Sequence, residues 1–290
     1  MRGHTLVALA LCTLAACGKD GSSPASPSPP PGQNAPVVYA AIGASDALGI
    51  GASVPCIPFV PCPDGTGYVP IIARRLSETR TVTTTNLGIP AAVIGPEIQR
   101  LGLDHGRTIP GNFIDNEVPF VPRDATLVTI FAGGNDANAI GAAVEGGAGG
   151  SDPGAFLDAQ IRQFGASYDA LVGGIRERAP AARIVAANLP NLAGAPYASG
   201  YSLARRQVLQ RVSVGFSTEV VNRLVNRQVI VVDLLCDGRA YDPANYSSDG
   251  FHPDDSGYAF MADLFVDAIL RGTPVTPPAR CPQMSVVPPL

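Results

Sequence analysis

Five short runs of β-branched and apolar residues alternate with longer amphipathic segments after residue 36, and this alternation restricts the fold more than any other feature. The runs are Val37–Ile42, Thr81–Asn86, Thr126–Phe131, Arg183–Asn188 and Gln228–Asp233. Several are apolar throughout, which is typical of parallel strands covered on both faces. Helical patterns cover Tyr68–Glu78, Pro153–Arg178 (with a candidate break at Gly173-Gly174), Leu203–Arg227 and Asp255–Arg271. We therefore expect an α/β fold, a three-layer α/β/α sandwich with a five-stranded parallel sheet.

All basic residues of this chain other than the histidines are arginines, except Lys19, which lies near the N-terminus. A folded part without lysine excludes a P-loop lysine, a Schiff-base lysine and a Ser–Lys dyad. With 20 Lys+Arg against 24 Asp+Glu, the formal net charge is −4, which argues against nucleic acid as a partner. Three histidines and no Cys-x-x-Cys pair argue against zinc, and we expect neither a metal nor a cofactor.

The N-terminus has the pattern of a secretory signal. Arg2 precedes an almost unbroken apolar run from Thr5 to Ala16, which is too short for the roughly 20 residues that cross a bilayer. The run ends in Leu14-Ala15-Ala16-Cys17-Gly18, which resembles the lipobox of bacterial lipoproteins. The resemblance implies lipidation of Cys17 and membrane anchoring, while cleavage of an ordinary signal nearby is the alternative. No Asp follows Cys17 directly, so the outer membrane is favoured over the inner one.

The segment after Cys17 is rich in Ser, Pro and Gly and has no apolar periodicity. Such a segment cannot bury enough surface to offset its ordering entropy. We therefore expect a signal peptide over residues 1–16, a lipidated tether over 17–36 and one folded domain over 37–290.

Residues with catalytic potential follow the predicted strands. Ser45 lies in a Gly-rich turn after the first run, Gly88 follows the second, and Asn135 follows the third in Gly133-Gly134-Asn135-Asp136. Asp249 and His252 lie in Asp249-Gly250-Phe251-His252-Pro253, before the last helical pattern. Because ligands of open parallel sheets bind at the carboxyl ends of the strands, these residues are expected to lie close together.

These four blocks, in this order, resemble those of the SGNH/GDSL hydrolase family. The resemblance covers the chain after the tether and implies a flavodoxin-like fold and an esterase or lipase that needs no cofactor. It implies that Ser45 is the nucleophile, His252 its general base and Asp249 the partner of the imidazole. It also implies an oxyanion hole formed by the N–H groups of Ser45 and Gly88 and the Asn135 amide.

One block departs from the family pattern, because the chain has Gly43-Ala44-Ser45-Asp46 where the family has Gly-Asp-Ser-Leu. Asp46 is expected either to point into the site or to cap the next helix. Structural roles also remain open for the other residues: a helix cap for Ser45 or Asn135, a turn for Gly88, and a surface position for His252. Asp136 is expected to be structural, His105 to lie in a surface loop, and residues 141–150 to form a flexible loop at the rim of the pocket.

Other function classes fit the sequence less well. An α/β-hydrolase needs Gly-x-Ser-x-Gly near mid-chain, and a dinucleotide site needs a glycine where Val54 stands. A non-catalytic surface-binding lipoprotein has no need for Ser, Asn, Asp and His together. A carbohydrate O-acetyl esterase on the same fold stays open, as do the acyl length and the alcohol of the ester; the protein is expected to act as a monomer.

Four cysteines are expected to form disulfides, because export implies an oxidising compartment. They are Cys56, Cys62, Cys236 and Cys281, and three pairings exist. We favour Cys56–Cys62, which closes a proline-containing loop soon after Ser45. Cys236–Cys281 would then fasten the C-terminal tail to the end of the last strand.

Overall fold

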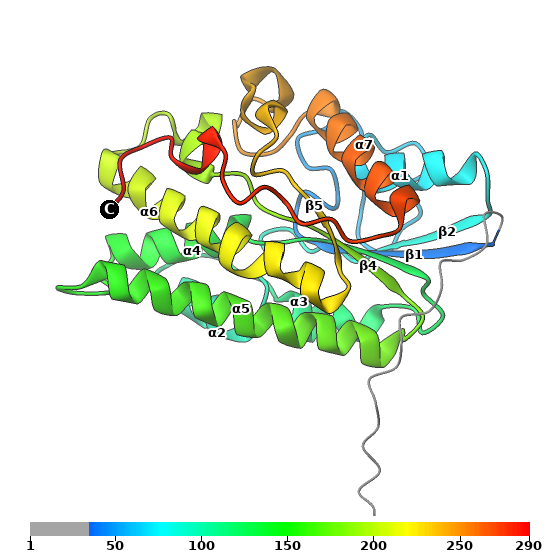
Figure 1. The fold of residues 1–290 in the computed structure, drawn as a ribbon, viewed down its shortest axis with the longest axis horizontal. Helices are drawn as coiled ribbons and strands as arrows, with labels where there is room; N and C mark the ends of the chain where they lie inside the picture. The colour runs from blue at the N-terminus through cyan, green and yellow to red at the C-terminus, as the bar shows by residue number, and fades with distance from the viewer. Residues whose placement is uncertain (1–34) are drawn as a thin grey trace, which may run out of the picture.

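The computed structural model describes residues 35–290, so the predicted signal segment, Cys17 and nearly all of the tether lie outside the described residues. The described part contains a five-stranded, fully parallel sheet in the order β2-β1-β3-β4-β5 (Figure 1). The strands are β1 (Val37–Gly43), β2 (Val82–Asn86), β3 (Leu127–Phe131), β4 (Arg183–Ala187) and β5 (Ile230–Val232). This sheet confirms the predicted fold class, with each strand within two residues of its predicted limits.

Helices cover both faces of the sheet. The α-helices are α1 (Tyr68–Ser77), α2 (Pro96–Asp104), α3 (Phe113–Asn116), α4 (Gly134–Glu145), α5 (Pro153–Arg178), α6 (Leu203–Gly215) and α7 (Asp255–Arg271). The short helical segments are η1 (Val118–Phe120), η2 (Leu192–Gly194), η3 (Pro196–Ala198), η4 (Phe216–Val220), η5 (Val221–Arg227), η6 (Gly238–Tyr241), η7 (Pro243–Asn245) and η8 (Pro282–Met284). Helices α1 and α7 pack together on one face, and α2 to α6 lie toward the other (Figure 1).

The sequence of β1 explains how one strand supplies both cores. Tyr39 and Ala41 belong to the cluster formed with α1 and α7, whereas Ala40 and Ile42 belong to the cluster formed with α4 to α6. Successive side chains of a strand point to opposite faces, so a strand between two helical layers must be apolar at every position. The continuous apolar runs of the sequence therefore correspond to a sheet buried on both sides.

Three sequence predictions about helices need correction. Helix α5 is continuous through Gly173-Gly174, because Gly174 faces Val118 and packs closely there. The helix predicted over Leu203–Arg227 changes at Phe216 to a π-helical turn and then to a 3₁₀ segment. Residues 141–145 are the last part of α4, and only the glycine-rich turns after Glu145 form a loop.

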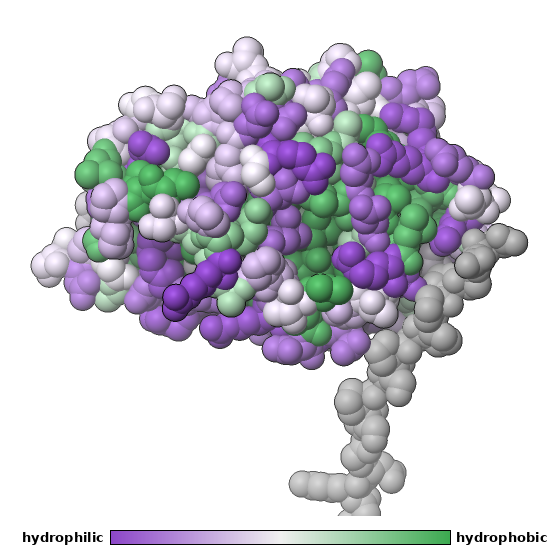
Figure 2. Space-filling view, turned by 45° about the horizontal axis from the view of Figure 1, so that its top comes forward, coloured by the Kyte–Doolittle hydropathy of each residue, from purple (hydrophilic) through white to green (hydrophobic). Residues whose placement is uncertain are grey.

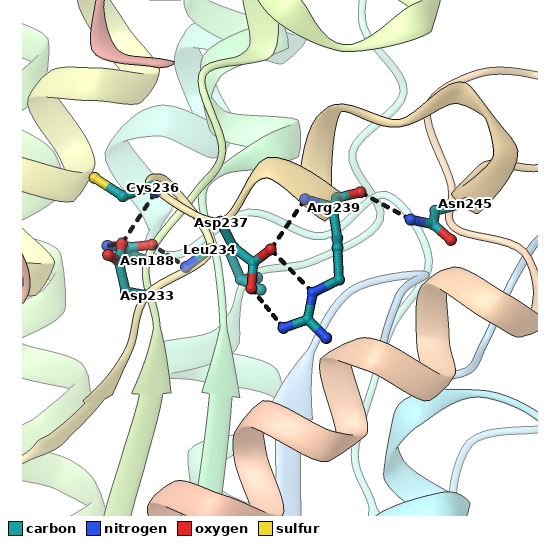
Figure 3. Close-up of polar contacts among 7 residues, drawn as sticks. All are labelled: Asn188, Asp233, Leu234, Cys236, Asp237, Arg239 and Asn245. Carbon is teal, nitrogen blue, oxygen red and sulfur yellow. Dashed lines mark hydrogen bonds and ion pairs between the residues drawn. The ribbon is translucent and has the colours of Figure 1, made fainter. Parts of the chain in front are cut away.

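A buried polar network joins the ends of β4 and β5 (Figure 3). Asn188, which has no exposed surface, accepts the N–H groups of Leu234 (2.7 Å) and Leu235 (2.8 Å) and donates to Asp233 Oδ1 (2.7 Å). The chain continues from this network into the Asp237–Arg239 ion pair, and the Arg239 carbonyl accepts from Asn245 Nδ2 (2.9 Å). This network holds the start of the segment that leads to His252.

Both predicted disulfide pairs are present in the structure, Cys56–Cys62 and Cys236–Cys281. Beyond Cys281 the tail runs back along α6, where the side chain of Gln210 accepts the N–H of Val286 (2.8 Å) and donates to the carbonyl of Val287 (2.7 Å) (Figure 1). The tail is therefore fastened both by a covalent bond and by buried hydrogen bonds.

The surface mixes polar and apolar side chains. Figure 2 shows one face on which apolar side chains appear in separate areas between hydrophilic ones. Among residues 35–290, no helix combines the length and the apolar character that a membrane crossing requires.

Candidate active site

Three of the predicted site residues form a continuous chain of hydrogen bonds. Ser45 Oγ lies 2.8 Å from His252 Nε2, and His252 Nδ1 lies 2.6 Å from Asp249 Oδ2. Ser45 is only 6% exposed, whereas the side chains of His252 and Asp249 are 17% and 48% exposed. The structure thus brings together residues 207 positions apart, in the order hydroxyl, imidazole, carboxylate.

The turn that carries Ser45 is braced from two sides. On one side Asn86, the last residue of β2, donates from Nδ2 to the carbonyl of Ala47 (2.6 Å). On the other side the buried Glu117 accepts the N–H of Gly43 at Oε2 (3.0 Å). No helix starts at this turn, because the next one begins at Tyr68, so neither Ser45 nor Asp46 caps a helix.

The loop that carries His252 is organised around Asp249. Asp249 Oδ1 accepts the N–H groups of Phe251 (2.8 Å) and His252 (2.9 Å), so the carboxylate orients both the ring and its backbone. Gly250 has φ +67°, a conformation that L side chains rarely adopt. Gly51 has φ +98°, and a Cβ there would lie 2.8 Å from His252 Cβ. The second glycine of Gly49-Ile50-Gly51 therefore allows the histidine loop to approach the serine turn.

Asn135 lies at the start of α4, where its Nδ2 donates to the carbonyl of Ala92 (3.0 Å). It lines a cleft of about 450 Å³ together with Ser45 and His252. The amide thus keeps a second N–H in reach of the cleft, while the first fixes its orientation.

Gly88 is placed differently from the other three blocks. Its N–H donates to Asn86 Oδ1 (3.1 Å), and Gly88 does not line the cleft. Ala91, three residues further on, does line the cleft and adopts φ +62°. Within residues 35–290 the N–H groups of Ala91 and Ser45 have no hydrogen-bond partner. Ser45 and Ala91 therefore line the cleft with unpaired backbone N–H groups, whereas the N–H of Gly88 is engaged by Asn86.

Solved structures of other proteins share this fold at low sequence identity. An extracellular lipase from Streptomyces rimosus has the same fold, with TM-score 0.55, 20% identity, and coverage of 82% of this chain and 100% of the lipase. A phospholipase A1 from Streptomyces albidoflavus matches with TM-score 0.54, 16% identity, and coverage of 82% and 100%. An acetyl xylan esterase variant from Geobacillus stearothermophilus matches with TM-score 0.50, 15% identity, and coverage of 83% and 97%. A search of curated proteins finds no significant match.

The sequence itself gives the decisive match. The model of the GDSL-like lipase/acylhydrolase family matches residues 41–260, about three quarters of the chain. The chain belongs to the GDSL-like lipase/acylhydrolase family. The matched region extends from β1 into α7, and it contains Ser45, Asn135 and His252.

The two carboxylates close to His252, Asp249 and Asp46, differ in electrostatic environment. Partial burial raises the pKa of Asp249, but hydrogen bonds from the His252 ring and from two backbone N–H groups outweigh it and lower the pKa to about 2. Asp249 therefore carries its charge throughout the neutral range. Burial raises the pKa of Asp46, an effect that the nearby His252 opposes. Asp46 is half-buried and is one of the residues that line an inner cavity.

Two cavities meet beside the serine. The outer one is the cleft described above, and the inner one is a narrow, mainly apolar cavity of about 50 Å³. Asn135 and Phe251 line both cavities, and Ala44 and Gly133 line the inner one close to the nucleophile turn. A group bonded to the Ser45 oxygen can therefore extend in two directions of different polarity.

Glu117 supports the site although no sequence pattern pointed to it, whereas Asp136 and His105 lie as predicted. Glu117 is in a segment for which no element was predicted. Burial raises its pKa well above the usual range, and hydrogen bonds from the N–H groups of Gly43 and Ile89 only partly oppose this rise. Its only sequence signal is an isolated carboxylate before Val118-Pro119-Phe120. Asp136 is buried and structural, accepting the Ile94 N–H (2.9 Å), and His105 lies in a loop at the end of α2. Among the described residues no group of three His, Cys, Asp or Glu side chains is arranged to hold a metal ion.

Proposed function

We propose that this protein hydrolyses carboxylic esters through a covalent acyl intermediate on Ser45. The observation that carries the proposal is the pair of hydrogen bonds that joins Ser45 Oγ to His252 and His252 to Asp249. A serine hydroxyl needs an adjacent base to become a nucleophile, and the base needs a partner that fixes its tautomer. Membership of a family of ester-hydrolysing enzymes supports an acyl ester over other electrophiles.

In the proposed reaction Ser45 Oγ attacks the carbonyl carbon while His252 Nε2 takes the hydroxyl proton. The Asp249 carboxylate stabilises the imidazolium, which then gives the proton to the leaving alcohol. Water attacks the acyl enzyme by the same route and releases the carboxylic acid. The negative oxygen of each tetrahedral intermediate is bound by the Ser45 N–H, the Asn135 amide and the Ala91 N–H. Ala91 is favoured over Gly88 as the third donor, because the Gly88 N–H is engaged by Asn86 and Gly88 does not line the cleft.

The size and lining of the inner cavity suggest that the acyl group of the substrate is short. Its apolar lining suits an alkyl chain, and its volume of about 50 Å³ leaves room for only a few carbon atoms. On p-nitrophenyl esters from acetyl to palmitoyl we expect kcat/KM to be highest at two to six carbons. A maximum at palmitoyl would contradict this assignment of the inner cavity.

Replacement of the nucleophile tests the mechanism. Ser45→Ala removes one buried hydroxyl, so the fold should persist while hydrolysis of p-nitrophenyl acetate and labelling by a fluorophosphonate probe are lost. Ser53→Ala is a matched control, because Ser53 contacts Asp255 away from the triad (Oγ–Oδ2 2.6 Å). Wild-type turnover by Ser45→Ala would refute the proposal, and a non-catalytic binding protein would show neither turnover nor labelling before any substitution.

We also propose that the protein is exported and anchored through lipid on Cys17, with residues 17–36 as tether and 37–290 as the catalytic domain. Two disulfides support export, because they persist in oxidising compartments. The anchor rests on the sequence around Cys17, which is outside the described residues. Metabolic labelling with an alkyne fatty acid should mark the wild type and not Cys17→Ser; equal labelling of both would end the idea.

A further inference from the structure

The outer cleft has an unusual charge for this protein. Its lining contains two arginines, Arg107 and Arg205, and no Asp or Glu. The chain as a whole has more acidic than basic residues, with a net charge of −4. A cleft lined by one sign of charge concentrates the field inside it and raises the local concentration of oppositely charged ligands. The two arginines that line the cleft with Ser45 therefore favour the approach of a negatively charged ligand.

Arg205, in the first turns of α6, is held in a fixed orientation. The guanidinium carbon lies 3.8 Å from the centre of the Tyr201 ring, and Nη1 pairs with Glu145 (3.1 Å). No residue in the range 35–290 bonds to its Nη2. The ion pair offsets part of the charge, while the stacked ring orients the guanidinium, so that less rotamer entropy is lost when a ligand binds.

Arg107 enters the cleft from the loop after α2, and its charge is not offset. Its backbone N–H bonds to the carbonyl of Gly102 (2.9 Å), which fixes the position of the loop. Its side chain is half-buried and forms no ion pair or hydrogen bond with another described residue. Arginine with five donors in a planar fork binds phosphate oxygens in a bidentate manner. An unpaired, half-buried arginine beside a nucleophile is thus poised to bind an anionic group of the substrate.

The two cavities determine which part of the ester carries this anion. The inner cavity is apolar and suits the acyl group, so the alcohol occupies the outer cleft with Arg107 and Arg205. We propose that the substrates are carboxylic esters whose alcohol carries a phosphate group, which the two arginines bind. This inference rests on the proposed esterase function. In the reaction the acyl C–O bond breaks, water supplies the hydroxyl of the acid and a proton to the alcohol, and the phosphate stays on the alcohol.

A pair of substrates that differ only in phosphate tests the proposal. We would compare 1-butyrylglycerol with 1-butyrylglycerol 3-phosphate, and expect kcat/KM of the wild type to be at least tenfold higher for the phosphate ester. Arg107→Gln should reduce this ratio to about 1, and Arg107→Lys should restore part of it. Arg100→Gln removes an exposed arginine of the neighbouring α2 outside the cleft, and should leave the ratio and both rates unchanged. The ratio should also fall with added salt, because exposed charges are screened.

A binding measurement separates this inference from the esterase function. Calorimetry of glycerol 3-phosphate with Ser45→Ala should show binding that glycerol lacks and that Arg107→Gln weakens at least fivefold. Equal rates on the two esters, or a ratio unaffected by Arg107→Gln, would overturn the inference while leaving the esterase intact. Turnover of neither ester together with Arg107-dependent binding would instead refute only the esterase. Binding of Ser45→Ala to vesicles of dioleoylphosphatidic acid identifies the source of the phosphate independently of acyl length: binding that Arg107→Gln weakens indicates a lipid headgroup, and binding of soluble glycerol 3-phosphate alone indicates a free phosphate ester.

Discussion

Asn135 is the residue at which the geometry makes the sharpest kinetic prediction. One N–H of its amide bonds to the Ala92 carbonyl, and the other is open to the cleft that contains Ser45. Loss of one oxyanion donor typically lowers kcat by about 10²–10³-fold. Asn135→Ala should therefore lower kcat by this amount with little change in KM, measured by steady-state hydrolysis of p-nitrophenyl butyrate.

The matched control for this substitution is Asn226→Ala, because Asn226 is exposed and away from the cleft. It should leave both constants within about twofold of the wild type. A rise in KM without loss of kcat for Asn135→Ala would show that the amide binds substrate and transition state equally, and would remove it from the oxyanion hole.

Asp136, the next residue, gives a pH-dependent prediction. Burial raises its pKa to about 7, although the N–H groups of Ile94, Asp136 and Gly133 oppose the rise. The folded state then holds a proton that the unfolded state has released, so the free energy of unfolding should fall as the pH rises from about 4 to about 7. Asp136→Asn keeps an acceptor for Ile94 and removes the titration, and should gain up to roughly 4 kcal/mol relative to the wild type across that interval. Urea unfolding at pH 4.5, 6 and 8 measures this, and a constant difference would contradict it.

The side chain of Asn188 links the end of β4 to the segment that follows β5. Its side chain accepts two backbone N–H groups after β5 and donates to Asp233 and Asn222. Asn188→Ala leaves the N–H groups of Leu234 and Leu235 buried without partners, at about 1–3 kcal/mol each. We therefore expect a loss of roughly 2–6 kcal/mol in the free energy of unfolding, measured by urea unfolding.

Asn222→Ala is the comparison, because it removes only one of the four hydrogen bonds made by the side chain of Asn188. It should cost about 1 kcal/mol. Equal losses for the two variants would mean that the link to β5 contributes little to stability.

The elements also show what sequence patterns reveal and what they miss. All five strands were predicted from short runs rich in β-branched residues, and several of these runs are apolar throughout because both faces of the sheet are covered; the edge strand β2, Val-Thr-Thr-Thr-Asn, was recognised by its β-branched residues alone. Helix α2 was missed because it is short and starts at Pro96 after Gly95, in a segment whose glycines and prolines indicate turns. The end of α4 was expected to be a loop, since Gly141 and its neighbours have weak helix propensity, but Gly141 lies against Leu209 of α6 and tertiary packing decides the conformation.

The same distinction applies within the site. Ser45, Asn135, Asp249 and His252 were predicted as a group because their blocks, in this order, resemble those of the SGNH/GDSL family, and Ser45 and Asn135 also follow strands whose ends meet at one edge of the sheet. Ala91 and Arg107 were not, because their place in the cleft depends on the path of the loops between β2 and β3. Gly88 was assigned to the oxyanion hole by the same resemblance, and in the structure the side chain of Asn86 accepts its N–H.

At the scale of the whole molecule, the two disulfides close chain segments of very different length. Cys56–Cys62 spans 6 positions and Cys236–Cys281 spans 45, including the loop of His252 and all of α7. The loop-entropy relation assigns about 2 kcal/mol to the first and about 4 kcal/mol to the second. The longer bridge should therefore contribute more to global stability.

Two double variants test this difference. Cys236→Ser with Cys281→Ser should lose about 4 kcal/mol in urea unfolding under non-reducing conditions, against about 2 kcal/mol for Cys56→Ser with Cys62→Ser. The C-terminal tail of the first variant should also become sensitive to limited proteolysis, since its remaining contacts are the hydrogen bonds to side chains such as Gln210 and Asn191. If the short-loop variant lost as much stability as the long-loop variant, strain or lost packing rather than chain entropy would control the effect. A tail that stayed resistant to protease without Cys281 would show that its contacts with α6 hold it unaided.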